Sequence, residues 1–158
     1  MKRVLESGIF VAMLALAACG DGGEPPAVPQ GNFQLLMVGV RSLPVQIGDK
    51  YLDGYYDALA AGSLRFLSRG RLLVAGTTHR LNADGSQRTE TVDTALFRYR
   101  FLDDVLELEF DDPLGVRQDT LEYMDHQSRQ ALRAISAHYA RSGSPAPLLD
   151  GALYVRID

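Results

Sequence analysis

The sequence predicts a mainly β domain built as an antiparallel meander. From about residue 31 onward, short apolar runs alternate with segments rich in glycine, asparagine and aspartate, which favour turns. The strongest observation is a hairpin over residues 97–110, in which a single register gives matching pairs on both faces of the two strands. Residues 31–158 are therefore expected to form one β domain.

Residues 1–18 are predicted to be a secretion signal. Met1-Lys2-Arg3 supplies positive charge, and the apolar stretch 8–18 is shorter than the roughly 20 residues of a membrane-spanning helix. The small pair Ala17-Ala18 and the following Cys19 resemble the lipobox of bacterial lipoproteins. An ordinary signal peptide followed by an incidental cysteine is the alternative.

The lipobox resemblance implies that Cys19 is the lipid-attachment site and that a membrane partner is reached through this lipid. Gly20 occupies the position where inner-membrane lipoproteins tend to carry aspartate, which favours the outer membrane with the domain facing the periplasm. Residues 19–30, rich in glycine and proline, are expected to be a flexible tether.

Composition excludes some classes of partner. The net charge is −4 and there is no basic block, which argues against nucleic-acid binding. Arginine greatly outnumbers lysine, but the arginines are spread along the chain, so we attribute them to base composition rather than to an anion site.

The first half of the domain is predicted to contain one ambiguous segment between strands. Residues 33–38 form an apolar run typical of a strand, and 49–61 combine helical spacing with the helix-weakening Gly54. Next, 64–66 and 72–75 are expected to form a hairpin. A two-residue turn there pairs Phe66 with Leu73 and Leu64 with Ala75. Residues 77–81 and 88–94 continue as strands.

The hairpin over residues 97–110 is the best-defined element. With Asp103-Asp104 at the turn, the predicted pairs are Phe101 with Leu106, Tyr99 with Leu108, Phe97 with Phe110, Arg100 with Glu107 and Arg98 with Glu109. A slip by one residue would move all apolar members to the wrong face.

The C-terminal part is predicted to contain two strands and a helix. Residues 119–124 and 152–156 are the strands. Residues 128–141 are expected to be a short helix, because Ser128 is a candidate N-cap and Leu132, Ile135 and Tyr139 have helical spacing. A strand is the alternative for this segment. Residues 144–149 are expected to be a loop.

Several short segments resemble small bacterial lipocalin-like lipoproteins. They are Gly31-Asn32-Phe33-Gln34-Leu35 followed by Leu43-Pro44, the hairpins that include Ala61-Gly62-Ser63-Leu64, Phe97-Arg98-Tyr99 and Val105-Leu106-Glu107-Leu108, and the final Leu153-Tyr154-Val155-Arg156. The resemblance implies an antiparallel β-barrel or half-barrel in the cell envelope. Most members have no assigned activity. Arg69-Gly70 stands where Asp-Gly is usual, and residues 128–149 have no counterpart.

The sequence contains none of the motifs that would carry catalysis. There is no Gly-x-Ser-x-Gly, no His-Glu-x-x-His and no phosphate-binding glycine loop, so we expect no enzyme, cofactor or metal. His79, His126 and His138 are isolated and expected to be structural. The acid pairs at 103–104 and 111–112 are expected to lie about 20 Å apart and to be solvated rather than to bind calcium.

Tyr51, Tyr55 and Tyr56 are the candidate ligand-binding residues, because they form the main aromatic concentration. A lid over the barrel core is the alternative. Two functions follow as hypotheses. One is a lipid-anchored module that binds a small apolar or amphipathic ligand in the barrel. The other is a non-catalytic interaction, structural or inhibitor module with an envelope protein partner.

Overall fold

The computed structural model describes residues 28–112, 115–136 and 148–158, and every regular element within them is a strand. The signal, Cys19 and most of the tether lie outside these residues. The strands are β1 (Asn32–Val38), β2 (Arg41–Ser42), β3 (Val45–Ile47), β4 (Tyr56–Leu67), β5 (Arg71–Leu81), β6 (Gln87–Leu102), β7 (Val105–Asp112), β8 (Gly115–His126), β9 (Arg129–Ser136) and β10 (Ala152–Arg156).

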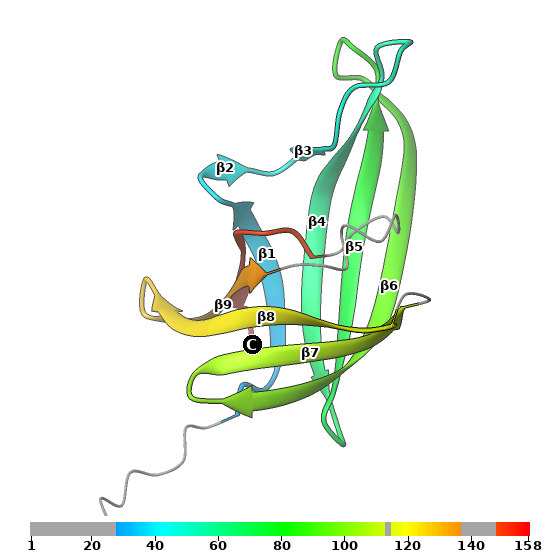
Figure 1. The fold of residues 1–158 in the computed structure, drawn as a ribbon. Helices are drawn as coiled ribbons and strands as arrows, with labels where there is room; N and C mark the ends of the chain where they lie inside the picture. The colour runs from blue at the N-terminus through cyan, green and yellow to red at the C-terminus, as the bar shows by residue number, and fades with distance from the viewer. Residues whose placement is uncertain (1–27, 113–114, 137–147) are drawn as a thin grey trace, which may run out of the picture.

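The strands form an antiparallel meander that closes into an eight-stranded barrel (Figure 1). From β4 to β10 each strand pairs with the next one in the chain, and β1 pairs with both β10 and β4. The short β2 and β3 pair with β1 and β4 on the connection between these two strands. The mainly β meander and the barrel are thereby confirmed.

The barrel interior is built by alternation along each strand. On β5, Leu72 and Val74 are buried and the residues between them are less so. The same alternation on the other strands brings large apolar side chains together, each less than 2 % exposed: Phe33, Leu59, Leu64, Leu72, Val74, Phe97, Leu106, Leu108, Leu121, Leu132 and Tyr154. The core therefore fills the described part of the interior.

Three consecutive strands are much longer than β1 and β10. β4, β5 and β6 have 12, 11 and 16 residues, whereas β1 and β10 have 7 and 5. They project beyond the barrel at the top of Figure 1. We call this region the upper extension: the ends of these strands with the loop 48–55 and the turn 82–86.

The barrel closes through a short strand pair. β1 and β4 share three residue pairs, with Phe33 opposite Leu64 at the centre, and Phe66 N–H donates to the Gly31 carbonyl at 3.2 Å. Gly62 lies beside this pair. A Cβ at Gly62 would lie 3.2 Å from Leu35 Cβ and 3.4 Å from Tyr154 Cε1. Glycine therefore lets β1 side chains pack against β4.

The predicted register of the β6–β7 hairpin is confirmed up to the last pair. Asp103 and Asp104 form the turn, both with positive φ, and the ladder runs to Arg98 opposite Glu109. It ends one pair before the predicted Phe97–Phe110 pair. On the outer face the Arg100 guanidinium lies 3.2 Å from Glu107 and 2.8 Å from the Glu109 carboxylate.

The predicted register of the β4–β5 hairpin is wrong by one residue. Phe66 pairs with Leu72 rather than Leu73, and Leu64 pairs with Val74 rather than Ala75. The loop has three residues, 68–70, and two of them have positive φ. The extra residue in the loop places Leu72 and Val74 inside the barrel. Together these two side chains are larger than Leu73 and Ala75, which alternate with them along β5.

The predicted helix at 128–141 is wrong for the residues that the structure describes. Gln127-Ser128 forms a two-residue turn with φ of 53° and 62°, and β9 follows directly. Leu132 points inward while Ile135 is exposed on the outer face, so the period is two. Residues 137–147 lie outside the description. The ambiguous segment 49–61 becomes a turn followed by the start of β4.

Replacing Gly62 with valine is expected to destabilise the barrel by about 1–3 kcal/mol, because the added methyl groups overpack Leu35 and Tyr154. The free energy of unfolding in urea measures this. Ser63→Val, at the exposed neighbouring position on β4, is the control and is expected to change stability little. Equal stability of the two variants would contradict the packing constraint.

Candidate functional site

Two of the three predicted tyrosines form a cluster on the upper extension. Tyr51 and Tyr55 stack with ring centroids 4.2 Å apart, and the Arg80 guanidinium lies 5.2 Å and 5.1 Å from these rings. Arg88 lies 5.3 Å from the Tyr55 ring. Asp57 accepts hydrogen bonds from Tyr51 Oη at 2.9 Å and Arg80 Nε at 2.8 Å. The cluster attaches the loop 48–55 to β4 and β5.

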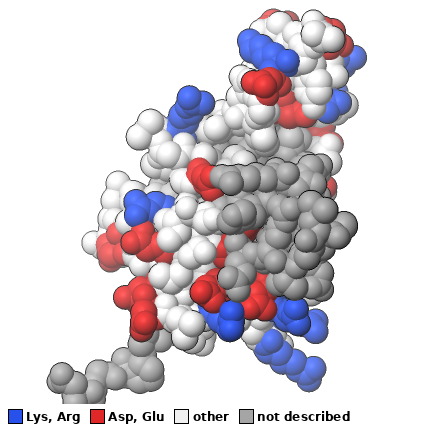
Figure 2. Space-filling view, viewed as in Figure 1, with Lys and Arg blue, Asp and Glu red and all other residues white. Residues whose placement is uncertain are grey.

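The third tyrosine is placed differently. Tyr56 is contacted by Lys50, whose Nζ lies 5.5 Å from the ring centroid. The Arg80 guanidinium is occupied by Asp57, and its hydrogen bonds hold the pKa of that carboxyl below its usual value. Acidic and basic side chains are intermixed at this end of the molecule (Figure 2). The contacts of the tyrosines with charged side chains thus hold the loop 48–55 in place.

A groove of about 600 Å³ lies on the outer face of the barrel, away from the tyrosines. β1 and β10 supply one wall and the β8–β9 turn supplies the other. The lining residues used below are Leu36, His126, Arg129, Val155 and Ile157.

The floor of this groove is apolar because β10 has apolar residues on both faces. Ala152 and Tyr154 point into the barrel, whereas Leu153 and Val155 belong to a separate buried cluster with Ala131. On β1 a register shift between Leu35 and Met37 marks a bulge at Leu36. Leu36 and Ile157 are left 46 % and 60 % exposed beside the groove.

The turn wall of the groove is polar and conformationally unusual. Non-glycine residues occupy both central positions of the Gln127-Ser128 turn at positive φ, where asparagine and glycine are typical. Asp125 Oδ1 holds the turn by accepting the Ser128 N–H at 2.9 Å. His126 Nε2 is buried, and the described residues offer it no hydrogen-bond partner.

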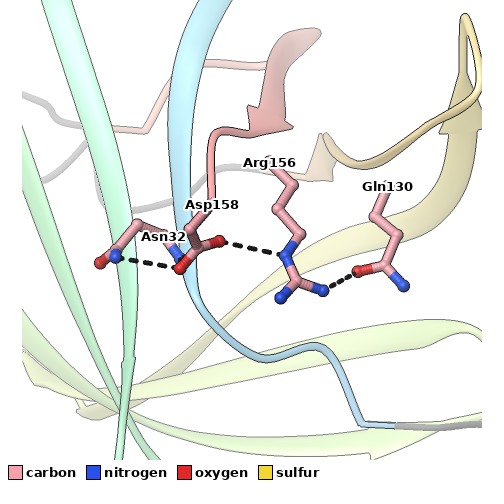
Figure 3. A network of polar contacts seen from close by, with 4 residues as sticks. All are labelled: Asn32, Gln130, Arg156 and Asp158. Atoms are coloured by element: carbon pink, nitrogen blue, oxygen red, sulfur yellow. Dashed lines mark hydrogen bonds and ion pairs between the residues drawn. The ribbon is translucent and has the colours of Figure 1, made fainter.

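A smaller pocket of about 400 Å³ continues the groove at its polar end. The two pockets share Arg129 and Ile157. Figure 3 shows the neighbouring network: Arg156 contacts Asp158 at 3.0 Å and donates to Gln130 Oε1 at 2.7 Å. Among the described residues, no carboxylate forms an ion pair with the exposed Arg129. One arginine of this region is thus occupied and the other is open.

Sequence reasoning located the tyrosines but missed the groove. The available signal was β10, where apolar residues follow one another without alternation, which indicates that both faces are covered. His126, expected to be structural, is the last residue of β8 and pairs with Arg129 across the turn. His79, also expected to be structural, pairs with Glu90 at 3.0 Å on the neighbouring strand.

Comparison with protein-family models, curated proteins and solved structures finds no match. In the described ranges, no group of three or more histidine, cysteine or acidic residues is arranged to hold a metal. None of the described residues belongs to a helix long and apolar enough to cross a membrane. The function is therefore inferred from the geometry of the barrel.

The Asp158 carboxylate is expected to make stability depend on pH. The backbone N–H of Asn32 and the Arg156 side chain donate to it, which lowers its pKa. A lowered pKa stabilises the fold above the unfolded value of about 3.9, and this contribution is lost as pH falls through the folded value.

We therefore expect Asp158→Asn to lower the melting temperature at pH 7 and the difference from wild type to shrink under acid conditions. The measurement is the melting temperature of both proteins from pH 7 down to acid pH. Asp53→Asn, in an exposed turn, is the control. A difference that is constant with pH would contradict this role of Asp158.

Proposed function

We propose that the protein is a lipid-anchored envelope protein that binds a small amphipathic ligand in the outer groove, not inside the barrel. The observation that carries this proposal is the juxtaposition of a filled interior with a groove on the outer face. An enzymatic role has no support from the arrangement of the described side chains.

The packing of the interior argues against a ligand there. Eight strands make a barrel just wide enough for side chains to fill or for one small ligand to enter. Phe33, Phe97 and Tyr154 already occupy the described interior and are almost completely buried. A ligand at this level would displace core side chains at a cost in stability.

The outer groove has the properties of a ligand site. Its volume of about 600 Å³ lies within the range of about 300–1,000 Å³ typical of small-molecule sites. Leu36, Val155 and Ile157 supply apolar surface, and His126 and Arg129 supply polar groups on one side. This division suits a molecule with an apolar part and a polar end.

The proposed anchor places this groove near a source of amphipathic molecules. Ile157 N–H donates to the Asn32 carbonyl at 3.0 Å, so the groove begins beside the first residue of β1. A tether over residues 19–30 spans at most about 40 Å when extended. An acylated Cys19 would keep the groove within that distance of the lipid surface.

A second candidate function has its own observation. Val40 and Leu52 are fully exposed at the apices of two turns, where polar residues are usual. Exposed aliphatic side chains at such positions favour contact with another envelope protein. A non-catalytic interaction module is therefore the alternative function.

The proposed anchor predicts that Cys19→Ser releases the protein from the membrane. Wild-type protein is expected in the membrane fraction with the mass of an acylated Cys19, because several acyl chains make dissociation negligible. The variant is expected in the soluble periplasmic fraction. Mass spectrometry and fractionation measure both. An unmodified Cys19 in the wild-type protein would refute the anchor.

The proposed site predicts that the apolar dye N-phenyl-1-naphthylamine binds the Cys19→Ser protein with increased fluorescence. Leu36→Asp and Ile157→Asp are expected to weaken binding at least about tenfold, because each places a charge on the apolar wall. Leu96→Asp, on the exposed outer face of β6, is the control. Binding that survives both groove variants would place the ligand elsewhere, and absence of binding would favour the interaction module.

A further inference from the structure

We propose that the ligand of the outer groove is a single-chain amphipathic anion, a long-chain carboxylate, with its head group at Arg129 and His126. This inference rests on the proposed function of the groove and names the chemical class of its ligand. Four features of the groove support this ligand: the apolar wall, the open cation, the unpaired imidazole nitrogen and the turn that holds them.

The apolar wall fits a single hydrocarbon chain. Leu36 from β1, Val155 from β10 and Ile157, which follows β10, line the groove. Leu36 and Ile157 remain about half exposed, so a chain lying between them would remove this apolar surface from water. The binding contribution grows with each methylene that is buried.

The polar end carries one open positive charge. Arg129 lines both the groove and the smaller pocket, so its guanidinium stands where the apolar surface ends. Arg156 nearby is already held by Asp158 and Gln130 (Figure 3). A guanidinium presents a planar set of donors that matches a carboxylate. Arg129 is therefore the group that selects an anionic head.

The neighbouring carboxylates do not occupy this cation. Asp125 accepts the backbone N–H of Ser128, and Asp158 accepts from Asn32 and Arg156. Both acids are thus engaged in fixing the ends of the strands that border the site. The position open to an added carboxylate is beside Arg129.

His126 supplies the second polar contact. The His126 side chain lines the groove, and its Nε2 atom is buried without an acceptor or donor among the described residues. A buried polar atom without a hydrogen-bond partner destabilises the protein. A ligand oxygen that forms a hydrogen bond with this atom removes that free-energy cost. An N–H at Nε2 would donate to the carboxylate from the same wall as Arg129.

The β8–β9 turn positions these two side chains. His126 and Arg129 form the closing pair of the turn, with Gln127 and Ser128 between them at positive φ. Residues other than glycine adopt this conformation at a cost, and such positions cluster at binding sites. The two-residue turn places His126 and Arg129, the side chains proposed to contact the head group, on one side of the groove.

The size of the site favours one small molecule over a protein. The groove has a volume of about 600 Å³, which lies within the range of about 300–1,000 Å³ typical of small-molecule sites. The acyl chains of Cys19 are a second source of hydrocarbon. They carry no carboxylate, so the test separates them from a free long-chain acid.

The test compares the fluorescent fatty acid cis-parinarate with its methyl ester, which has the same chain without the charge. For the full-length Cys19→Ser protein, we expect the acid to bind at least about tenfold more tightly than the ester, which corresponds to about 1.4 kcal/mol. Arg129→Gln is expected to remove this difference. Arg65→Gln, on the exposed face of β4, is the matched control and is expected to keep the difference.

The outcomes separate this inference from the proposed function. Equal binding of acid and ester, or a difference that survives Arg129→Gln, would overturn the anionic ligand and leave the groove intact. Absence of binding for both probes would overturn the proposed function as well. Binding to Cys19→Ser but not to the acylated protein would show that the chain's own lipid fills the groove, which also overturns a free carboxylate. Circular dichroism of Arg129→Gln verifies that it is folded.

Discussion

The architecture depends on the pairing of β1 with β4, which turns an open sheet into a barrel. Only three residue pairs form this contact, and the central one sets Phe33 against Leu64 in the core. Gly62 allows the close approach of Leu35 and Tyr154 at this point. Without this pair, β1 and β4 would be exposed sheet edges, and the apolar inner face would open to water. A small contact therefore protects a large core.

Closure of the barrel also determines where binding chemistry can lie. Large side chains occupy the described interior, and the two pockets described above lie on the outer face. At the upper extension the tyrosines and Arg80 are used to hold a loop. On the outer face, β10 and the bulge in β1 leave apolar side chains beside a polar turn. The groove is thus a product of two local irregularities on a regular barrel.

The sequence predicted elements whose pairing is determined by local pattern. The β6–β7 register follows from alternation on both faces, so the charged and apolar pairs agree. The β4–β5 register failed because Leu72-Leu73-Val74-Ala75 is apolar on both faces and gives no preference for either one. The sequence predicts a helix in place of β9 because the spacing of Leu132 and Ile135 fits the helical period of 3.6 residues. The same spacing also fits a partly exposed strand. The groove joins β1 to the β8–β9 turn, which lies about 90 residues later in the sequence, and no local pattern contains that contact.

The neighbours of β1 have a consequence for the order in which the chain can fold. β1 begins at Asn32 and pairs with β10, which ends at Arg156, and the Asn32 backbone is bound by Asp158. One edge of the first strand therefore lacks its hydrogen-bonding partner until the last strand is available. Because the partner of the first strand is the last strand, the ring of strands cannot be completed until the whole domain has been synthesised.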